Sequence, residues 1–169
     1  IYFTPEEEAL AGQVAAKGPF VVVEPSVKKN ATENKKWGLA NYDAVVRQFP
    51  TVRFVRPVFE DRREFPVSEP LDGLTFRQLC AVIARADAYL GAEGGCHHAA
   101  RILGVPAVVI FGGAVNPEIT GYPEHVNFAD PEPCGSFLPC PHCQRYFEGL
   151  TPSMVADALK PILHSRGLA

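Results

Sequence analysis

Four short apolar runs are the clearest feature of the hydrophobic pattern along this chain. Three of them lack polar alternation, which is typical of strands buried on both faces of a parallel sheet, and the second alternates. The runs predict strands at 20–25, 51–58, 88–91 and 107–112. Residues 59–73, which are charged and contain proline, are expected to form a loop.

Between these runs, apolar residues recur at helical spacing. Thr4, followed by Pro5 and three glutamates, predicts a helix start, and Thr75 with Gln78 predicts a capping box. The predicted helices cover 5–17, a segment around 39–49, 76–87, 95–103 and a last stretch from Pro152. The proline-rich chain from 114 to 150 is expected to be irregular.

Strands that alternate with helices define an α/β fold, here a Rossmann-like, mainly parallel sheet with helices on both faces. At 169 residues, the chain is expected to form a single domain, 1–169. It begins at Ile1 without a methionine, so we expect either a fragment of a longer protein or a processed form.

Composition excludes several classes of protein. The net charge of −3 gives no basic face for nucleic acid, and no apolar run reaches the roughly 20 residues that a transmembrane segment needs. Five cysteines without a secretion signal favour reduced thiols and a cytoplasmic protein.

Two polar loops would gather at the carboxyl edge of the sheet, where α/β proteins bind ligands. These are EPSVKKNATENKKW, residues 24–37, and GAEGGCHH, residues 91–98. Lysines opposite a glycine-rich helix start suggest a phosphate site, but lysines in a solvated loop beside glycines in a tight turn would give the same pattern. His97 and His98 are about 100° apart on a helix, so one is expected to face a ligand while the other is partly buried or at the surface.

The segment LTFRQLCAVIARADAYLGAEGGCHHAARILGVPAVVIFGG, residues 74–113, resembles the hallmark region of glycosyltransferase family nine, the lipopolysaccharide heptosyltransferase family. Lys35-Lys36-Trp37 is similar to the Lys-x-Trp of that family, whose Asp and Ser are replaced here by Glu93 and Gly94. The resemblance implies the C-terminal, nucleotide-binding lobe of the two-lobed B-type glycosyltransferase fold. Together with the loop chemistry it gives these donor-binding candidates: Ser26, Lys35, Glu93, Gly94, Gly95, His98 and Thr120.

The resemblance also implies an activity. A sugar would pass from a nucleotide diphosphate, ADP-heptose being favoured, to a hydroxyl of a glycan or lipopolysaccharide-core acceptor, in the cytoplasm or at the inner membrane. No catalytic residue is expected in this chain, because the family carries its general base in an N-terminal lobe, so the chain alone should be inactive. No cofactor is expected for catalysis, since a helix start and Lys35 can stabilise the leaving diphosphate. A nucleotide-sugar epimerase on the same fold and a non-catalytic nucleotide-binding module are alternatives.

A cysteine cluster stands apart from these motifs. Cys134, Cys140 and Cys143, with His142 among them, have metal-ligand spacing and predict a structural zinc or iron site. Relatives of the heptosyltransferases that carry cysteine-bound iron in this region point the same way. The alternative is three free thiols, or one redox pair, in a surface loop.

Overall fold

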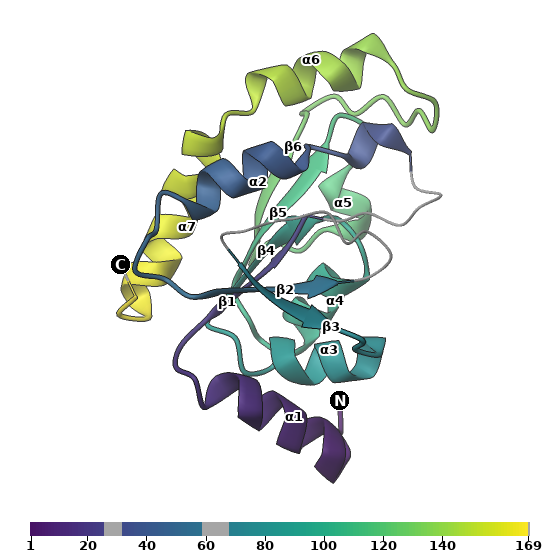
Figure 1. Cartoon of the computed structure of the whole chain (residues 1–169). Helices are drawn as coiled ribbons and strands as arrows, with labels where there is room; N and C mark the ends of the chain where they lie inside the picture. The colour runs from purple at the N-terminus through teal and green to yellow at the C-terminus, as the bar shows by residue number, and fades with distance from the viewer. Residues whose placement is uncertain (26–31, 59–67, 169) are drawn as a thin grey trace.

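The computed structural model describes residues 1–25, 32–58 and 68–168, and these form a six-stranded sheet between helices (Figure 1). The strand order is β3-β2-β1-β4-β5-β6, and each neighbouring pair is parallel. The strands are β1 (Val21–Glu24), β2 (Phe54–Val58), β3 (Glu69–Asp72), β4 (Ala88–Ala92), β5 (Ala107–Gly112) and β6 (Val126–Ala129). The predicted α/β, Rossmann-like parallel fold is confirmed.

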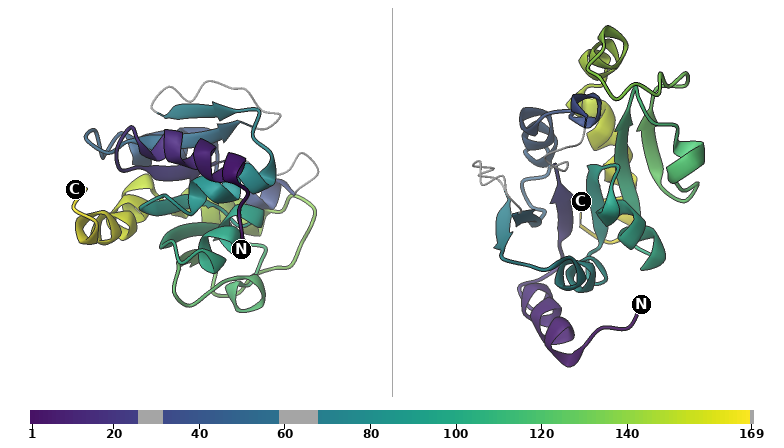
Figure 2. Two further views of the ribbon diagram at one scale, coloured as in Figure 1. Left: turned by 90° about the horizontal axis from the view of Figure 1, so that it is seen from below. Right: turned by 90° about the vertical axis from the view of Figure 1, so that its right-hand side faces the viewer.

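The central strands are apolar because both faces of the sheet are covered. In β1, Val21 and Val23 point into one hydrophobic core and Val22 points into the other. Helices α2 (Leu39–Val46) and α7 (Pro152–Ser165) cover the first face. Helices α1 (Pro5–Ala15), α3 (Phe76–Ile83) and α4 (Gly95–Ile102) cover the second, as two further views show (Figure 2).

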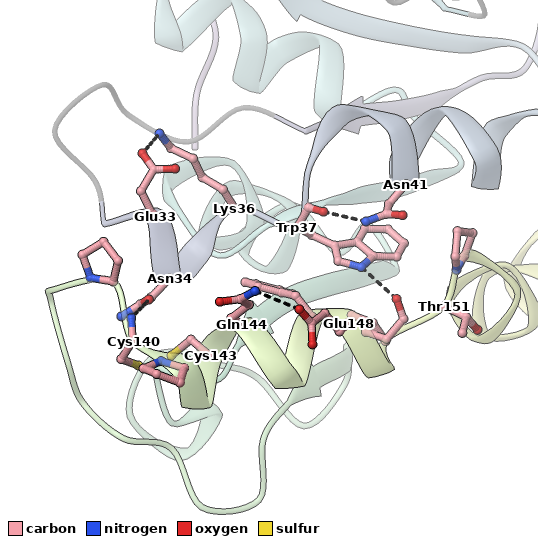
Figure 3. A pocket seen from close by; sticks show the side chains of 15 residues that line it. Glu33, Asn34, Lys36, Trp37, Asn41, Cys140, Cys143, Gln144, Glu148 and Thr151 are labelled. Atoms are coloured by element: carbon pink, nitrogen blue, oxygen red, sulfur yellow. Dashed lines mark hydrogen bonds and ion pairs between the residues drawn. The ribbon is translucent and has the colours of Figure 1, made fainter.

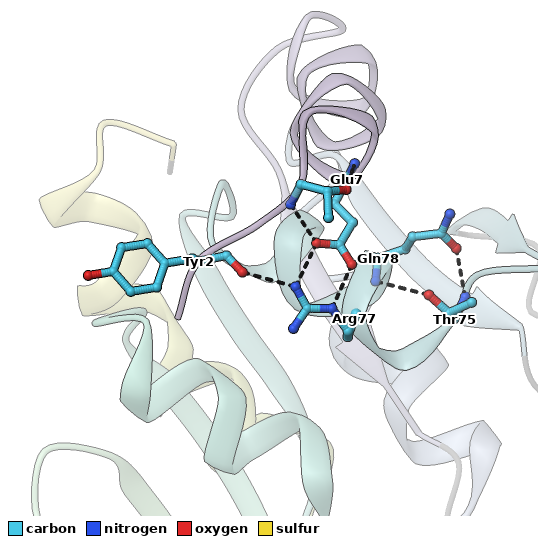
Figure 4. A network of polar contacts seen from close by, with 6 residues as sticks. Tyr2, Glu7, Thr75, Arg77 and Gln78 are labelled. Carbon is cyan, nitrogen blue, oxygen red and sulfur yellow. Dashed lines mark hydrogen bonds and ion pairs between the residues drawn. The ribbon is translucent and has the colours of Figure 1, made fainter.

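Both predicted helix starts form. The Thr4 hydroxyl accepts from the backbone N–H of Glu7 at 3.3 Å, and Thr75 makes the matching bond with Gln78 at 3.2 Å. The Glu7 carboxylate also accepts from the Arg77 guanidinium at 2.8 and 2.9 Å, and Arg77 donates to the Tyr2 carbonyl (Figure 4). Glu7, the third residue of α1 and part of its capping box, thus ties that helix to α3.

The prediction of a loop at 59–73 is wrong in its second half, and residues 59–67 lie outside the described part of the chain. Strand β3 pairs with β2 at the edge of the sheet. Its sequence, EPLD, is half polar because edge strands are half exposed, and an edge strand tolerates Pro70. A strand prediction that relies on apolar runs therefore misses β3.

The prediction of an irregular chain between 114 and 150 is also wrong. This segment contains α5 (Pro117–Thr120), strand β6 and α6 (Pro141–Gly149). In addition, a short 3-10 helix, η1 (Glu33–Lys35), interrupts the first polar loop. None of the helices in the described ranges has the length and apolar character needed to cross a bilayer.

Candidate functional site

The glycine-rich turn lies at the carboxyl edge of the sheet, between the end of β4 and the start of α4, as predicted. Gly91 can only be glycine here, because a Cβ atom at this position would lie 2.3 Å from the Tyr89 hydroxyl and 2.8 Å from the Glu24 carbonyl oxygen. Gly94 is the N-cap of α4, and a Cβ on it would meet open space. Gly95, the first residue of α4, is exposed, so the start of this helix is open to solvent there, which suits an anion.

His97 is fully buried, so the expectation of a partly buried or surface histidine is wrong. Its Nδ1 accepts a hydrogen bond from the Gly94 N–H at 3.0 Å. Nε2 therefore carries the ring hydrogen and donates to the Thr120 carbonyl at 2.9 Å. Burial lowers the pKa of His97, which is consistent with a neutral ring. His97 closes the turn onto α5, and neither nitrogen remains for a metal or a ligand.

His98 is half buried, and its Nδ1 lies 2.8 Å from the Tyr122 hydroxyl. The centroid of its ring lies only 4.0 Å from that of His97. The two rings therefore lie side by side, although the residues are about 100° apart around the helix axis. Within the described part of the chain, Nε2 of His98 makes no hydrogen bond, and this nitrogen is available to a ligand.

Lys35 and Glu93 were both predicted to be site residues, and the structure brings them together. They are 58 positions apart, yet the Lys35 ammonium forms an ion pair with the Glu93 carboxylate. Only 23% of the Lys35 side chain and 8% of the Glu93 side chain are exposed. The pair is therefore partly desolvated, which strengthens it relative to a surface salt bridge.

Two other predicted residues are less informative. Ser26 lies outside the described residues. Thr120 ends α5, and its carbonyl holds His97 while its Oγ1 is buried with no hydrogen-bond partner in the described chain. A contact between the Thr120 hydroxyl and a sugar therefore requires α5 to shift, and remains a prediction.

Sequence reasoning missed a buried carboxylic acid beneath the turn. Glu24, the last residue of β1, accepts a hydrogen bond from the Tyr89 hydroxyl at 2.8 Å and also lies beside the Cys96 thiol. Burial raises the pKa of Glu24 to about 7. The signal in the sequence was the single acid at the end of an otherwise apolar strand.

The three cysteines of the predicted cluster are brought together. The Cys134 sulfur lies 3.7 Å from that of Cys140 and 3.4 Å from that of Cys143. Three thiolates around one zinc ion at ~2.3 Å would be about 3.8 Å apart, so these separations fit a tetrahedral metal. His142 has its Nδ1 4.0 Å from the Cys143 sulfur and its Nε2 3.5 Å from an Asp130 oxygen.

A groove of about 670 Å³ runs beside this cluster, between η1, the start of α2, and α6 (Figure 3). Its walls include Asn34, Trp37 and Gln144, and the Trp37 indole N–H donates to the Leu150 carbonyl at 2.9 Å. Neither Glu93 nor His98 lines it. The groove is thus separate from the glycine-rich turn.

The fold defines the class: this chain has the architecture of one lobe of the two-lobed glycosyltransferases. No protein-family profile matches the sequence, and no curated protein does either. Solved structures match over nearly the whole chain. A family 9 glycosyltransferase from Veillonella parvula is 16% identical with a TM-score of 0.75, and the match covers 98% of this chain and 53% of that chain.

Two further matches are heptosyltransferases. The E. coli ADP-heptose lipopolysaccharide heptosyltransferase II is 17% identical, with a TM-score of 0.73 and coverage of 99% of this chain and 54% of that chain. The dodecameric, iron-containing heptosyltransferase TibC, solved with ADP-D-β-D-heptose and known from enterotoxigenic E. coli, is 18% identical. Its TM-score is 0.64, with coverage of 89% of this chain and 46% of that chain.

A putative UDP-N-acetylglucosamine 2-epimerase from Listeria monocytogenes matches less well, at 13% identity and a TM-score of 0.52, over 98% of this chain and 40% of that chain. The chain spans about half the length of the solved structures that it matches. At these identities, the similarity establishes the fold.

Proposed function

We propose that this chain is the donor-binding lobe of a heptosyltransferase-like glycosyltransferase, and that ADP-heptose or a close relative is the donor. One observation carries the proposal: Lys35, Glu93 and His98 come together at the open start of α4. The similarity to an ADP-heptose heptosyltransferase and to TibC, which was solved with ADP-D-β-D-heptose, supports the choice of ligand. The weaker epimerase match makes that alternative second.

The diphosphate would lie against the first turn of α4. Breaking the bond between sugar and diphosphate leaves negative charge on the departing phosphate oxygens, and fixed positive potential stabilises that charge. The N–H groups that open α4 and the Lys35 ammonium supply this potential. His98 would direct Nε2 at a phosphate oxygen or at the oxygen that links phosphate to sugar.

The remaining functions belong to the other half of such a two-lobed protein. The general base and the acceptor site, for a glycan or lipopolysaccharide-core hydroxyl, would come from that half. The full protein is then an enzyme, and this lobe supplies the donor.

We also propose that Cys134, Cys140 and Cys143 hold a structural zinc or iron ion; the His142 ring would have to turn for its Nδ1, now 4.0 Å from the Cys143 sulfur, to become the fourth ligand. The Asp130 carboxylate beside Nε2 would then orient the ring, an arrangement common around metal-bound histidines. The iron in TibC supports a metal of this kind.

Isothermal titration of the purified protein with ADP, UDP and GDP tests the donor site. Lys35→Ala and His98→Ala should each weaken ADP binding about tenfold, because a hydrogen bond to a charged group contributes roughly 1–3 kcal/mol. Lys36→Ala is the matched control, since Lys36 is the neighbouring lysine and pairs with Glu33 instead. Equal losses at Lys35 and Lys36, or no nucleotide binding at all, would contradict the proposal.

A further inference from the structure

Asn34, in the middle of η1, binds the cysteine-bearing loop with its whole side-chain amide. Its Nδ2 donates to the carbonyls of Ser136 at 2.8 Å and Leu138 at 2.7 Å, and its Oδ1 accepts from the Cys140 N–H at 3.3 Å. Asn34 is only 4% exposed. Both amide hydrogens and the oxygen are therefore used on one loop, and loss of the amide would leave buried backbone groups without partners.

The same loop is anchored at its other end on the sheet. The Cys134 N–H donates to the Gly113 carbonyl at 2.9 Å, and the Gly135 N–H donates to the Ala114 carbonyl at 3.1 Å. The three sulfurs thus lie between two sets of anchors, one just beyond β5 and one on η1. A metal bound to these sulfurs would hold them at their present separations and would thereby fix the distance between η1 and the end of β5.

The next residue after Asn34 is Lys35, which pairs with Glu93 at the phosphate-facing turn. Asn34 and Lys35 are consecutive residues of the same short 3-10 helix, so a displacement of the backbone at Asn34 also displaces Lys35. The packing of η1 is also tight: a Cβ on Gly112 would lie 2.9 Å from the Asn34 carbonyl oxygen. A change in the cysteine loop therefore reaches Lys35 through a single rigid turn.

We infer that Asn34 is a positioning residue that couples the thiol cluster to the donor site, so that a metal ion on the cysteines raises the affinity for a nucleoside diphosphate. The inference rests on the proposed function for its ligand. The metal fixes the loop, the Asn34 amide transmits that order to η1, and η1 holds Lys35 where a diphosphate can reach it. By linkage, the diphosphate must raise the affinity for the metal by the same factor.

The test measures this reciprocity with Zn²⁺ and ADP. The dissociation constant of Zn²⁺ is measured by competition with a chromophoric chelator, with and without saturating ADP. The dissociation constant of ADP is measured by calorimetry on metal-free and zinc-loaded protein. We expect both ratios to agree and to be about fivefold or more, within the usual range for coupled sites.

Asn34→Ala should bring the ratio close to one while Zn²⁺ and ADP each still bind. Asn41→Ala is the matched control, because the Asn41 amide donates to the Trp37 carbonyl at 2.6 Å and should leave the ratio unchanged. Lys35→Ala gives a second route if Asn34→Ala does not fold: it leaves the loop contacts in place, and it should lose the coupling but keep the affinity for Zn²⁺.

The possible outcomes separate the two proposals. A ratio near one in the unaltered protein, or a full ratio in Asn34→Ala, overturns the coupling and leaves the donor site standing. An absence of Zn²⁺ binding overturns the coupling and the zinc form of the proposed cysteine site, and it leaves the donor site standing. An absence of ADP binding in both metal states refutes the donor site and the coupling with it.

Discussion

His97 should be essential for the stability of the turn, although sequence reasoning gave it no role. In His97→Ala, the Gly94 N–H loses its acceptor and the Thr120 carbonyl loses its donor. Each lost bond costs about 1 kcal/mol, and removal of a fully buried ring leaves a cavity that costs about 2–3 kcal/mol more. The free energy of unfolding should therefore fall by about 4 kcal/mol in total.

Two partial replacements separate the two bonds. Asn can place an oxygen near the position of Nδ1 and keep the bond from Gly94, whereas Gln can place an amide N–H near Nε2 and keep the bond to Thr120. Each variant should recover about 1 kcal/mol or more relative to His97→Ala. Urea unfolding at pH 7.5, followed by circular dichroism, measures these differences, with His164→Ala at an exposed position of α7 as control.

The pH dependence gives an independent check. Because the pKa of His97 is lowered in the folded state, its contribution to stability is complete above the unfolded value of about 6.5 and is lost as the pH falls below it. His97→Ala should flatten this part of the stability profile. A loss below 1 kcal/mol, or an unchanged slope between pH 7 and 5, would refute the role of His97 as a clamp.

Three further predictions follow from named contacts. The pKa of Glu24 is about 7 in the folded protein, against an ordinary value of 4.5. Ionisation of this buried acid therefore lowers the free energy of unfolding as the pH rises from 4.5 to 7, by about 3 kcal/mol in all. Glu24→Gln should therefore gain stability over the unaltered protein at pH 8 but not at pH 4, as urea unfolding would show, and an equal difference at both would contradict this. Gly91→Ala should lower the free energy of unfolding by several kcal/mol, because the new Cβ would overlap the Tyr89 hydroxyl. Gly12→Ala is the control: its Cβ would meet open space in α1, and the free energy of unfolding should rise by roughly 0.5–1 kcal/mol. Thermal unfolding measures both changes. Cys143→Ser should remove about one equivalent of zinc or iron by elemental analysis and Cys80→Ser should not; a metal-free protein with three alkylated thiols in the folded state would remove the metal site.

Strands β1, β4 and β5 could be predicted because both of their faces are buried, which makes their sequences almost continuously apolar, and β2 could be predicted from its alternating pattern. The edge strands β3 and β6 could not. EPLD and VNFA bury only part of their side chains, so they lack the apolar run that identifies a strand within a single sequence. Their pairing depends on β2 and β5, which already present an unpaired edge.

Some features of the candidate site could likewise be predicted from the sequence, and others could not. That Lys35 and Glu93 would meet follows from the rule that loops at the carboxyl ends of parallel strands gather together. The role of His97 did not follow from its angle on a helical wheel, because the first turn of a helix also has N–H groups to satisfy. Gly94 has no side chain with which to cap α4, so the residue three positions later does it, as a Glu or Gln does in a capping box. The spacing Gly94-x-x-His97 was the available signal.

The ion pair between Lys35 and Glu93 determines what a diphosphate can gain from this lysine. Two unit charges 4 Å apart at an effective dielectric constant of 20 interact by about 4 kcal/mol, but Lys35 already has this interaction with Glu93 before any ligand arrives. The binding free energy that a diphosphate gains from Lys35 is therefore only the difference between the interaction of Lys35 with the diphosphate and its interaction with Glu93. For this reason we expect Lys35→Ala to weaken ADP binding about tenfold and not a thousandfold. The rest of the affinity must come from the N–H groups at the start of α4 and from His98. These groups act only if the turn keeps its shape, so the residues that bind no ligand, His97 beneath the turn and Asn34 behind Lys35, should influence donor affinity as strongly as those that do.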